Sequence, residues 1–299
     1  MSLLPFKKKT AAARPAGATR DLVRGFSIEV MPRTAAKIEA FRAILPEGTR
    51  VYVAHIAGTP IEDMVACAAR LRREGMEPMP HFPARIVPDR RTLGDWVARY
   101  EGEAGVREGL ILAGGVDAAV GDYSDSMQLL ASGAFARFRR LHVAGHPEGN
   151  RDIDPDGGTA TLSDALRWKQ GFAERTDAAM ALATQFCFEA EPVIAWAQSL
   201  RAAGIDLPIH IGVAGPAKLQ TLIRFAIACG VGPSLRVLQR RAMDVTKLVR
   251  PFEPTEFLTA LAEHKAADPG FPIEAVHVFP LGGIGASADW LARHSKDPE

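Results

Sequence analysis

One acidic residue occupies a position where a charge is costly. Glu29 is the only charged residue in the run FSIEVMP, which is otherwise mostly apolar. An unpaired carboxylate is unfavourable to bury, so Glu29 needs a charged partner or a chemical task. Burial would raise its pKa and let the carboxyl hold a proton near neutral pH, as a general acid does. A structural ion pair with Arg24 or Arg33 is the alternative interpretation.

Other polar and small residues stand near the ends of further apolar runs. Gln185, in the run AAMALATQFCF, carries both a hydrogen-bond donor and an acceptor. The alternative to a ligand contact at Gln185 is a bond to a neighbouring strand. Gly114 and Gly115 would let a flat ring approach the backbone closely, because they have no side chain. The other candidates of this kind are His55, His81, His146 and Glu148.

Eight apolar runs alternate with amphipathic stretches, which predicts repeated β-α units and a parallel sheet. The predicted strands span residues 26–32, 50–57, 77–84, 109–115, 140–147, 178–188, 208–215 and 275–283. Helical patterns separate them, for example from Pro60 to Gly75. Eight such units predict an α/β fold of the (β/α)8 or TIM-barrel type. Catalytic groups in this fold gather at the C-terminal ends of the strands, so the candidate residues would share one site.

The order of the elements favours a single domain. We expect residues 1–22 to form a flexible N-terminal arm and residues 23–299 to form the barrel and its catalytic site. The segment from Ser234 to Ala267 contains two successive helical patterns before the last strand, which predicts extra helices at that point. No Pro/Gly-rich or strongly charged stretch marks a second domain.

Composition excludes several classes of protein. Lys and Arg number 36 against 35 Asp and Glu, so no strong field attracts nucleic acid. The longest uncharged apolar stretch, from residue 178 to 188, is shorter than the roughly 20 residues that cross a membrane. The 3 cysteines lack CxxC spacing and no secretory signal is evident, so we expect a cytoplasmic protein. Composition leaves a homo-oligomer open.

Three strings in register resemble one enzyme family. FSIEVMPRT is similar to the first strand of methylenetetrahydrofolate reductases, where the pattern S-x-E-x-x-P places a glutamate in the barrel mouth. LHVAGHPEGN resembles their fifth-strand motif A-G-Y-P-E-G-H, and ATQFCFE resembles their sixth-strand motif T-Q-F-F-F-D. The resemblance covers roughly residues 25 to 230 and is weaker beyond.

This resemblance implies a reaction and a set of site residues. The reaction is hydride transfer from NAD(P)H to 5,10-methylenetetrahydrofolate, which gives 5-methyltetrahydrofolate. The resemblance makes Glu29 the acid at N10 and the stabiliser of the iminium cation, and Gln185 the anchor of the folate ring. It adds Glu148 and Phe186 as substrate contacts, and a structural contact to a neighbouring loop is the alternative for Glu148. The implied cofactor contacts are His81, Gly114, Gly115, Ala144, His146, Asn150, Arg167 and Lys169.

The chain departs from the flavin-containing members of that family. Ala113 and Gly115 stand where their R-G-D string carries Arg and Asp, His146 replaces a tyrosine, and Asn150 replaces a histidine. Several contacts to FAD are therefore missing. The departures favour the flavin-independent members, in which a nicotinamide passes hydride directly to the folate, and they leave FAD open.

Other classes of function remain as alternatives. A tetrahydrofolate-dependent methyltransferase or demethylase would use the same pocket without a hydride donor, and a non-catalytic folate-binding accessory protein would use it without turnover. A metal-dependent hydrolase with His55, His81 and His146 is disfavoured, because the first strand lacks a His-x-His pair. Oxidation of NADH or NADPH that depends on methylenetetrahydrofolate would distinguish the reductase from the accessory protein.

Overall fold

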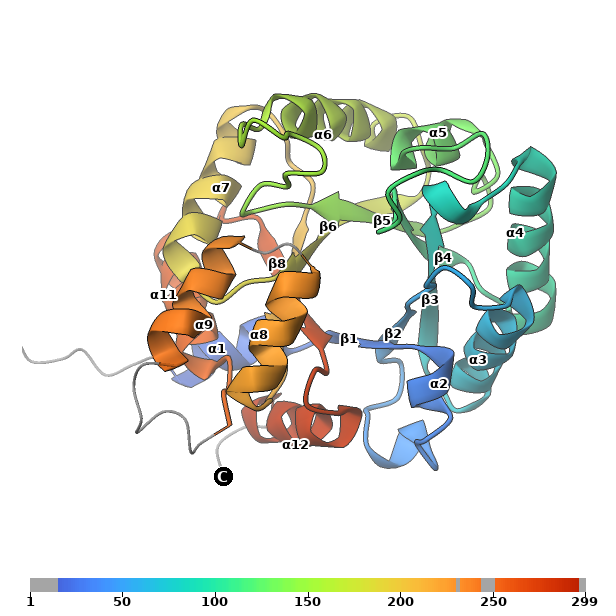
Figure 1. Cartoon of the computed structure of the whole chain (residues 1–299). Coiled ribbons are helices and arrows are strands. Elements are labelled where there is room, and N and C mark those ends of the chain that lie inside the picture. Colours follow the sequence, from blue (N-terminus) through green and yellow to red (C-terminus); the bar gives the residue numbers. More distant parts are fainter. Residues whose placement is uncertain (1–15, 230–231, 243–250, 296–299) are drawn as a thin grey trace, which may run out of the picture.

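The computed structural model describes residues 16–229, 232–242 and 251–295 of the chain (Figure 1). Eight parallel strands pair in chain order and close into a barrel, so the predicted TIM barrel is confirmed, as a single domain. The strands are β1 (Ser27–Val30), β2 (Arg50–Val53), β3 (Glu77–Pro83), β4 (Glu108–Leu112), β5 (Arg140–Gly145), β6 (Ala179–Phe186), β7 (Ile209–Ala214) and β8 (Ile273–Phe279). Each lies within a predicted strand or overlaps one.

A ring of helices covers the outside of the barrel (Figure 1). The helices are α1 (Ala16–Val23), α2 (Pro32–Ala35), α3 (Ile61–Arg73), α4 (Arg90–Ala104), α5 (Ser126–Ala131), α6 (Ala160–Ala173), α7 (Ala190–Ala202), α8 (Leu219–Ala228), α9 (Gly232–Ala242), α11 (Thr255–Ala267) and α12 (Ile284–Ser295). Two 3₁₀ turns, η1 (Phe41–Ala43) and η2 (Ala84–Ile86), lie in loops. No helix in the described part of the chain is long and apolar enough to cross a membrane.

The boundaries of α3 illustrate why these segments are helical. Pro60 lies just before the helix in an extended conformation, and Gly75 follows it with φ at 84°. Met64, Cys67, Ala68 and Leu71 recur at helical spacing and are buried against the barrel. A left-handed residue after a helix is favourable only for glycine, so the chain turns into β3 at that point.

The chain inserts extra helices between β7 and β8, as its sequence predicts. α8, α9 and α11 fill this interval, and residues 243–250 lie outside the described residues. A second hydrophobic cluster, separate from the main core, joins the extension to the end of the barrel through Phe186, Phe188, Leu222, Leu238 and Phe252. An isolated bridge between Ala217 and Phe252 closes its base.

The expected arm over residues 1–22 differs at its C-terminal end. α1 begins at Ala16, and its residues Leu22 and Val23 are buried in the main core. The helix contacts α11 and α12, so this part of the chain belongs to the barrel. Residues 1–15 lie outside the described residues.

Candidate functional site

The C-terminal end of the barrel holds a carboxylate between two histidines. Oε2 of Glu29, near the end of β1, lies 3.4 Å from Nε2 of His81 on β3 and 3.8 Å from Nε2 of His277 on β8. The Glu29 side chain is 22% exposed, the His81 side chain 11% and the His277 side chain 2%. Among the described residues, neither Arg24 nor Arg33 pairs with Glu29, so its partners are histidines.

The charge state of Glu29 differs from the sequence expectation. Burial alone would raise the pKa of this carboxyl, but a hydrogen bond with His277 and the charges of His81 and His277 hold the pKa below its usual range. Burial lowers the pKa of His81 to about 4, against the opposing effect of Glu29. At neutral pH the pair is therefore a carboxylate beside a neutral imidazole. In the free protein Glu29 stabilises a cation better than it donates a proton.

Contacts with Ser27 and Tyr52 fix the orientation of the His277 ring. Its Nδ1 hydrogen bonds with the Ser27 hydroxyl at 2.9 Å, and its ring packs on Tyr52 with centroids 4.2 Å apart. Sequence reasoning missed all three residues. The alternation of inward and outward side chains along AVHVFPL and RVYVAHI could have identified two of them. His277 and Tyr52 stand on the inward face of otherwise apolar strands.

Gln185 lies at an irregularity between β6 and β7. The pairing of these strands shifts register between Ala183 and Phe186. The Gln185 carbonyl accepts a hydrogen bond from the Thr184 hydroxyl, and the Gln185 side-chain oxygen accepts one from the Phe186 N–H at 3.3 Å. No hydrogen bond within the described residues engages its side-chain NH2. The bulge therefore leaves an amide donor at the same end of the barrel as Glu29.

The predicted substrate contacts Phe186 and Glu148 are engaged within the protein. Phe186 is 1% exposed and packs against Phe188 and Phe279, so its side chain is part of the protein interior. Both carboxylate oxygens of Glu148 accept hydrogen bonds from Ser234 at the start of α9, from its N–H at 3.0 Å and its hydroxyl at 2.5 Å. Burial raises the pKa of Glu148 in spite of these bonds. Glu148 joins the loop after β5 to the helical extension.

Three of the predicted cofactor contacts come together at the end of β5. The Lys169 ammonium reaches from α6 to within 3.4 Å of the Ala144 carbonyl. Burial lowers the pKa of Lys169 to about 8, against the opposing effect of Asp125. Burial and the Lys169 charge lower the pKa of His146 to about 4. This side of the mouth combines a buried cation with a neutral imidazole.

The remaining cofactor candidates are dispersed. The Arg167 side chain is 60% exposed and pairs with Asp164 at 2.6 Å on the outer face of α6. Oδ1 of Asn150 accepts the Asp152 N–H within its own turn. Gly114 follows β4 with φ at 100°, where an added Cβ would lie 3.0 Å from Pro83, and Gly115 has open space around it.

The positions of these candidate contacts show which dinucleotide cofactor the site fits. The departures at Ala113 and Gly115 remove charged flavin contacts, and Arg167 is turned away from the mouth toward Asp164. The residues present therefore do not fit FAD in the way expected for the flavin-containing members of the family that the sequence resembles. Gly114 and Gly115 leave room for a planar ring beside the backbone at the end of β4, which is compatible with a nicotinamide.

The histidines are not arranged around a metal. No group of three or more His, Cys, Asp or Glu side chains in the described ranges is placed to hold a metal ion. His55 follows the C-terminal end of β2: its Nε2 bonds with the Thr59 carbonyl at 3.1 Å, and its ring packs on Trp96.

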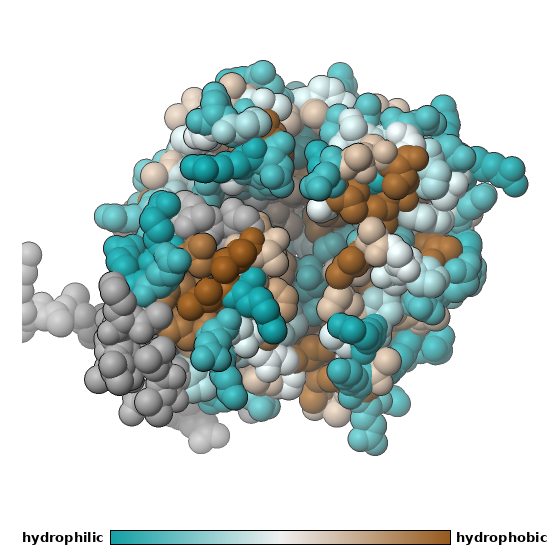
Figure 2. Space-filling model, in the orientation of Figure 1, coloured by the Kyte–Doolittle hydropathy of each residue, from teal (hydrophilic) through white to brown (hydrophobic). Residues whose placement is uncertain are grey.

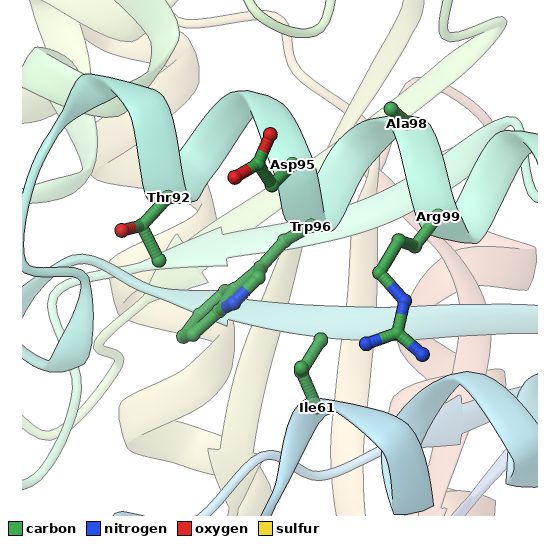
Figure 3. A pocket seen from close by; sticks show the side chains of 6 residues that line it. All are labelled: Ile61, Thr92, Asp95, Trp96, Ala98 and Arg99. Atoms are coloured by element: carbon green, nitrogen blue, oxygen red, sulfur yellow. The ribbon is translucent and has the colours of Figure 1, made fainter.

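The surface has two features besides the mouth. Figure 2 shows the face on which α8 and α9 lie, hollowed near its centre, with hydrophobic side chains gathered over the extension. A cavity of about 440 Å³ lies outside the barrel wall, where α4 meets the start of α3 (Figure 3). Its lining includes Ile61, Trp96 and Arg99, and Arg99 is already paired with Glu62 and Glu103. Asp95 lines the same cavity, which lies between the outer helices α3 and α4 and not among the barrel strands.

A solved structure shares the fold over nearly the whole chain. No family model matches the chain. An uncharacterized protein from Clostridium thermocellum that binds two copies of 5-methyl-5,6,7,8-tetrahydrofolic acid has a TM-score of 0.62 at 10% identity, over 95% of this chain and 99% of that one. The catalytic domain of a mannanase from Streptomyces sp. SirexAA-E has a TM-score of 0.40 at 16% identity, over 77% and 82%. The carboxyl transferase domain of Rhizobium etli pyruvate carboxylase with oxalate has a TM-score of 0.43 at 10% identity, over 94% and 46%. At 10% identity, the likeness to the Clostridium thermocellum protein is one of fold.

Proposed function

We propose that this protein binds a reduced folate in the C-terminal mouth of its barrel. The observation that carries the proposal is the placement of Glu29 between His81 and His277 at that end of the barrel. The Gln185 side-chain NH2, which no hydrogen bond within the described residues engages, lies at the same end. The fold likeness to a protein that binds 5-methyltetrahydrofolic acid supports the same ligand class. The strings that resemble methylenetetrahydrofolate reductases lie on β1, β5 and β6, which all open into this mouth.

The chemistry of a reduced pterin suits these residues. Its aminopyrimidinone edge presents both N–H donors and a carbonyl acceptor. The Glu29 carboxylate accepts hydrogen bonds from N–H groups or neutralises a cationic nitrogen, and the Gln185 amide donates to a carbonyl. The ring of Phe279, which packs on His277 with centroids 4.7 Å apart, offers a flat apolar surface.

Reductase activity is the more specific candidate. A carboxylate next to the ligand would stabilise the iminium cation that forms when the five-membered ring of methylenetetrahydrofolate opens. A nicotinamide, when bound, would supply the hydride. The ionised state of Glu29 favours the role of cation stabiliser over that of acid. Methyl transfer or demethylation, and folate binding without turnover, need only the pterin contacts, so they stand beside the reductase as alternatives.

Calorimetry with 5-methyltetrahydrofolate tests the binding. We expect saturable binding by the wild-type chain and a loss of about tenfold or more in Glu29→Gln, because removal of a partly buried charge contact typically costs more than about 1.4 kcal/mol. Glu39→Gln is the control, because it makes the same change at an exposed carboxylate away from the mouth. Absence of binding, or equal affinity in all three proteins, would refute the proposed site.

A kinetic assay then separates the candidate activities. Oxidation of NADH or NADPH that requires 5,10-methylenetetrahydrofolate supports a reductase. Tight binding of 5-methyltetrahydrofolate with no such oxidation supports an accessory protein or a methyl-transfer enzyme. An absorption spectrum of the purified chain shows directly whether a flavin is bound, because a bound flavin would colour the protein. A flavin band would overturn the preference for a nicotinamide alone.

A further inference from the structure

The segment that forms the helical extension has an unbalanced charge. Residues 207–243 contain no Asp or Glu, and their Lys and Arg residues are Lys218, Arg224, Arg236, Arg240 and Arg241. The whole chain has 36 Lys and Arg against 35 Asp and Glu, so the rest of the chain is net acidic. Like charges that lie close together repel one another and attract ions of the opposite sign. The extension therefore presents an excess of positive charge that its own sequence does not neutralise.

The extension is attached to the rim of the mouth by loops that follow several strands. Both carboxylate oxygens of Glu148, after β5, accept hydrogen bonds from Ser234 at the start of α9. Glu189, after β6, pairs with Arg240 of α9 at 2.8 Å. α8 itself follows the C-terminal end of β7 (Figure 1). Because the C-terminal ends of β5, β6 and β7 open into the mouth, α8 and α9 border the proposed ligand site.

One side of α8 and α9 is buried and the other is exposed. Leu222 of α8 and Leu238 of α9 are buried in the hydrophobic cluster that joins the extension to the strand ends. The exposed residues include Lys218, Arg224 and Arg236. No ion pair within the described residues engages any of these three cations. They are therefore available to an anion at the border of the mouth.

The neighbouring loops of the rim carry the opposite charge. The loop after β4, residues 113–125, contains three Asp and no Lys or Arg. The loop after β5, residues 146–159, contains Glu148 and three Asp against a single cation, Arg151. An anionic group that leaves the mouth is therefore repelled by these two loops and attracted by α8 and α9. The charge of the rim thus gives such a group one preferred direction.

We propose that Lys218, Arg224 and Arg236 bind the glutamyl tail of the folate, and that the protein prefers folates with an oligo-γ-glutamyl tail. The proposal rests on the folate site proposed above and names the form of folate that this site takes. A folate carries its pterin at one end and glutamate at the other, so a pterin held beside Glu29 leaves the tail to cross the rim. Each further γ-linked glutamate adds one carboxylate, which pairs with an ammonium or, in bidentate geometry, with a guanidinium. The attraction to α8 and α9 therefore grows with the length of the tail.

Calorimetry with two forms of one ligand tests the tail site. The full chain is titrated with 5-methyltetrahydrofolate that carries one glutamate and with the same compound that carries three, and the readout is the ratio of the two dissociation constants. The wild-type chain should bind the triglutamate form about fivefold or more tightly, because each exposed ion pair contributes a factor of about 1.4 to 5. High salt should bring the ratio toward one, because salt screens exposed charges.

Two double variants show whether the extension is responsible. Arg224→Gln/Arg236→Gln should lower the ratio to less than about twofold, because two of the three exposed cations are lost. The ratio is insensitive to a general loss of folded protein, which weakens binding of both forms alike. The matched control is Arg73→Gln/Arg175→Gln, which removes two exposed arginines that precede β3 and β6 at the opposite, N-terminal rim. Its ratio should equal that of the wild type.

The outcomes separate the tail site from the proposed function. Equal affinity of the wild type for the two forms, or an unchanged ratio in Arg224→Gln/Arg236→Gln, would overturn the tail site alone. Binding of free tri-γ-glutamate as tight as that of the triglutamate folate would also overturn it, because α8 and α9 would then attract any polyanion. Failure of both forms to bind would instead refute the proposed function, and the tail site with it.

Discussion

Substitution of Gly212 by alanine should distort the strand junction that carries Gln185. Gly212 on β7 faces the bulge of β6, and a Cβ added there would lie 2.4 Å from the carbonyl oxygen of Thr184 and 2.5 Å from that of Gln185. Both neighbours are backbone atoms, so neither can rotate away. The Gly212 N–H also donates to the Thr184 hydroxyl at 2.8 Å, and this bond must lengthen if β7 moves off β6.

The expected cost follows from these contacts. Overpacking of a close-packed interior costs about 1–3 kcal/mol, and loss of a buried hydrogen bond adds about 1 kcal/mol. Gly212→Ala should therefore destabilise the protein by about 2–4 kcal/mol, which lowers the melting temperature by about 3–6 °C in a chain of this size. Because the clash moves the Gln185 backbone, affinity for 5-methyltetrahydrofolate should fall as well.

Thermal unfolding and calorimetry check this prediction against a matched control. Gly94→Ala makes the same change in the exposed interior of α4, where an added Cβ meets nothing within 4 Å. It should stabilise the protein by about 0.5–1 kcal/mol and leave ligand affinity unchanged. A Gly212→Ala protein that melts with or above the wild type would refute the clash. A protein that melts early but binds normally would show that Gln185 does not contact the ligand.

Two further predictions concern stability. The folded-state pKa of His81 and of His146 is about 4, so the unfolded chain binds more protons than the folded one as the pH falls from about 6.5 toward 4. The free energy of unfolding should therefore fall in this window, by about 2 kcal/mol at pH 5 for His81, and His81→Gln should flatten urea-unfolding profiles between pH 7.5 and 5; an unaltered slope would contradict the buried neutral ring. At the opposite rim, the Glu108 side chain is 3% exposed and lies 2.7 Å from Arg50. Glu108→Gln should cost about 3–5 kcal/mol in urea unfolding and the exposed Glu103→Gln about 0–1 kcal/mol, and equal costs would argue against a buried ion pair.

The barrel could be predicted from the amino-acid sequence. Short apolar runs separated by amphipathic stretches predict the strands and helices. The reason is that burial of one face makes apolar residues recur with the period of a strand or of a helix. Eight such units commonly close into a barrel, as they do here. Glu29 stands in the middle of its run, and its expected place in the mouth came from the resemblance to methylenetetrahydrofolate reductases. The glycines after helical patterns, such as Gly75, marked where the chain turns, because their backbone tolerates positive φ.

The surroundings of those residues depend on contacts between distant parts of the chain, which the sequence pattern does not contain. His277 is paired with Ser27 across a separation of 250 residues, and this contact arises from closure of the first and last strands. The pKa of Glu29 depends on the balance between burial, which raises it, and two histidines on other strands, which lower it. No local sequence pattern therefore predicts the direction of the shift. Likewise Arg167 faces outward and Glu148 binds Ser234 of α9 because helix rotation and loop geometry set side-chain direction, and neither follows from sequence spacing.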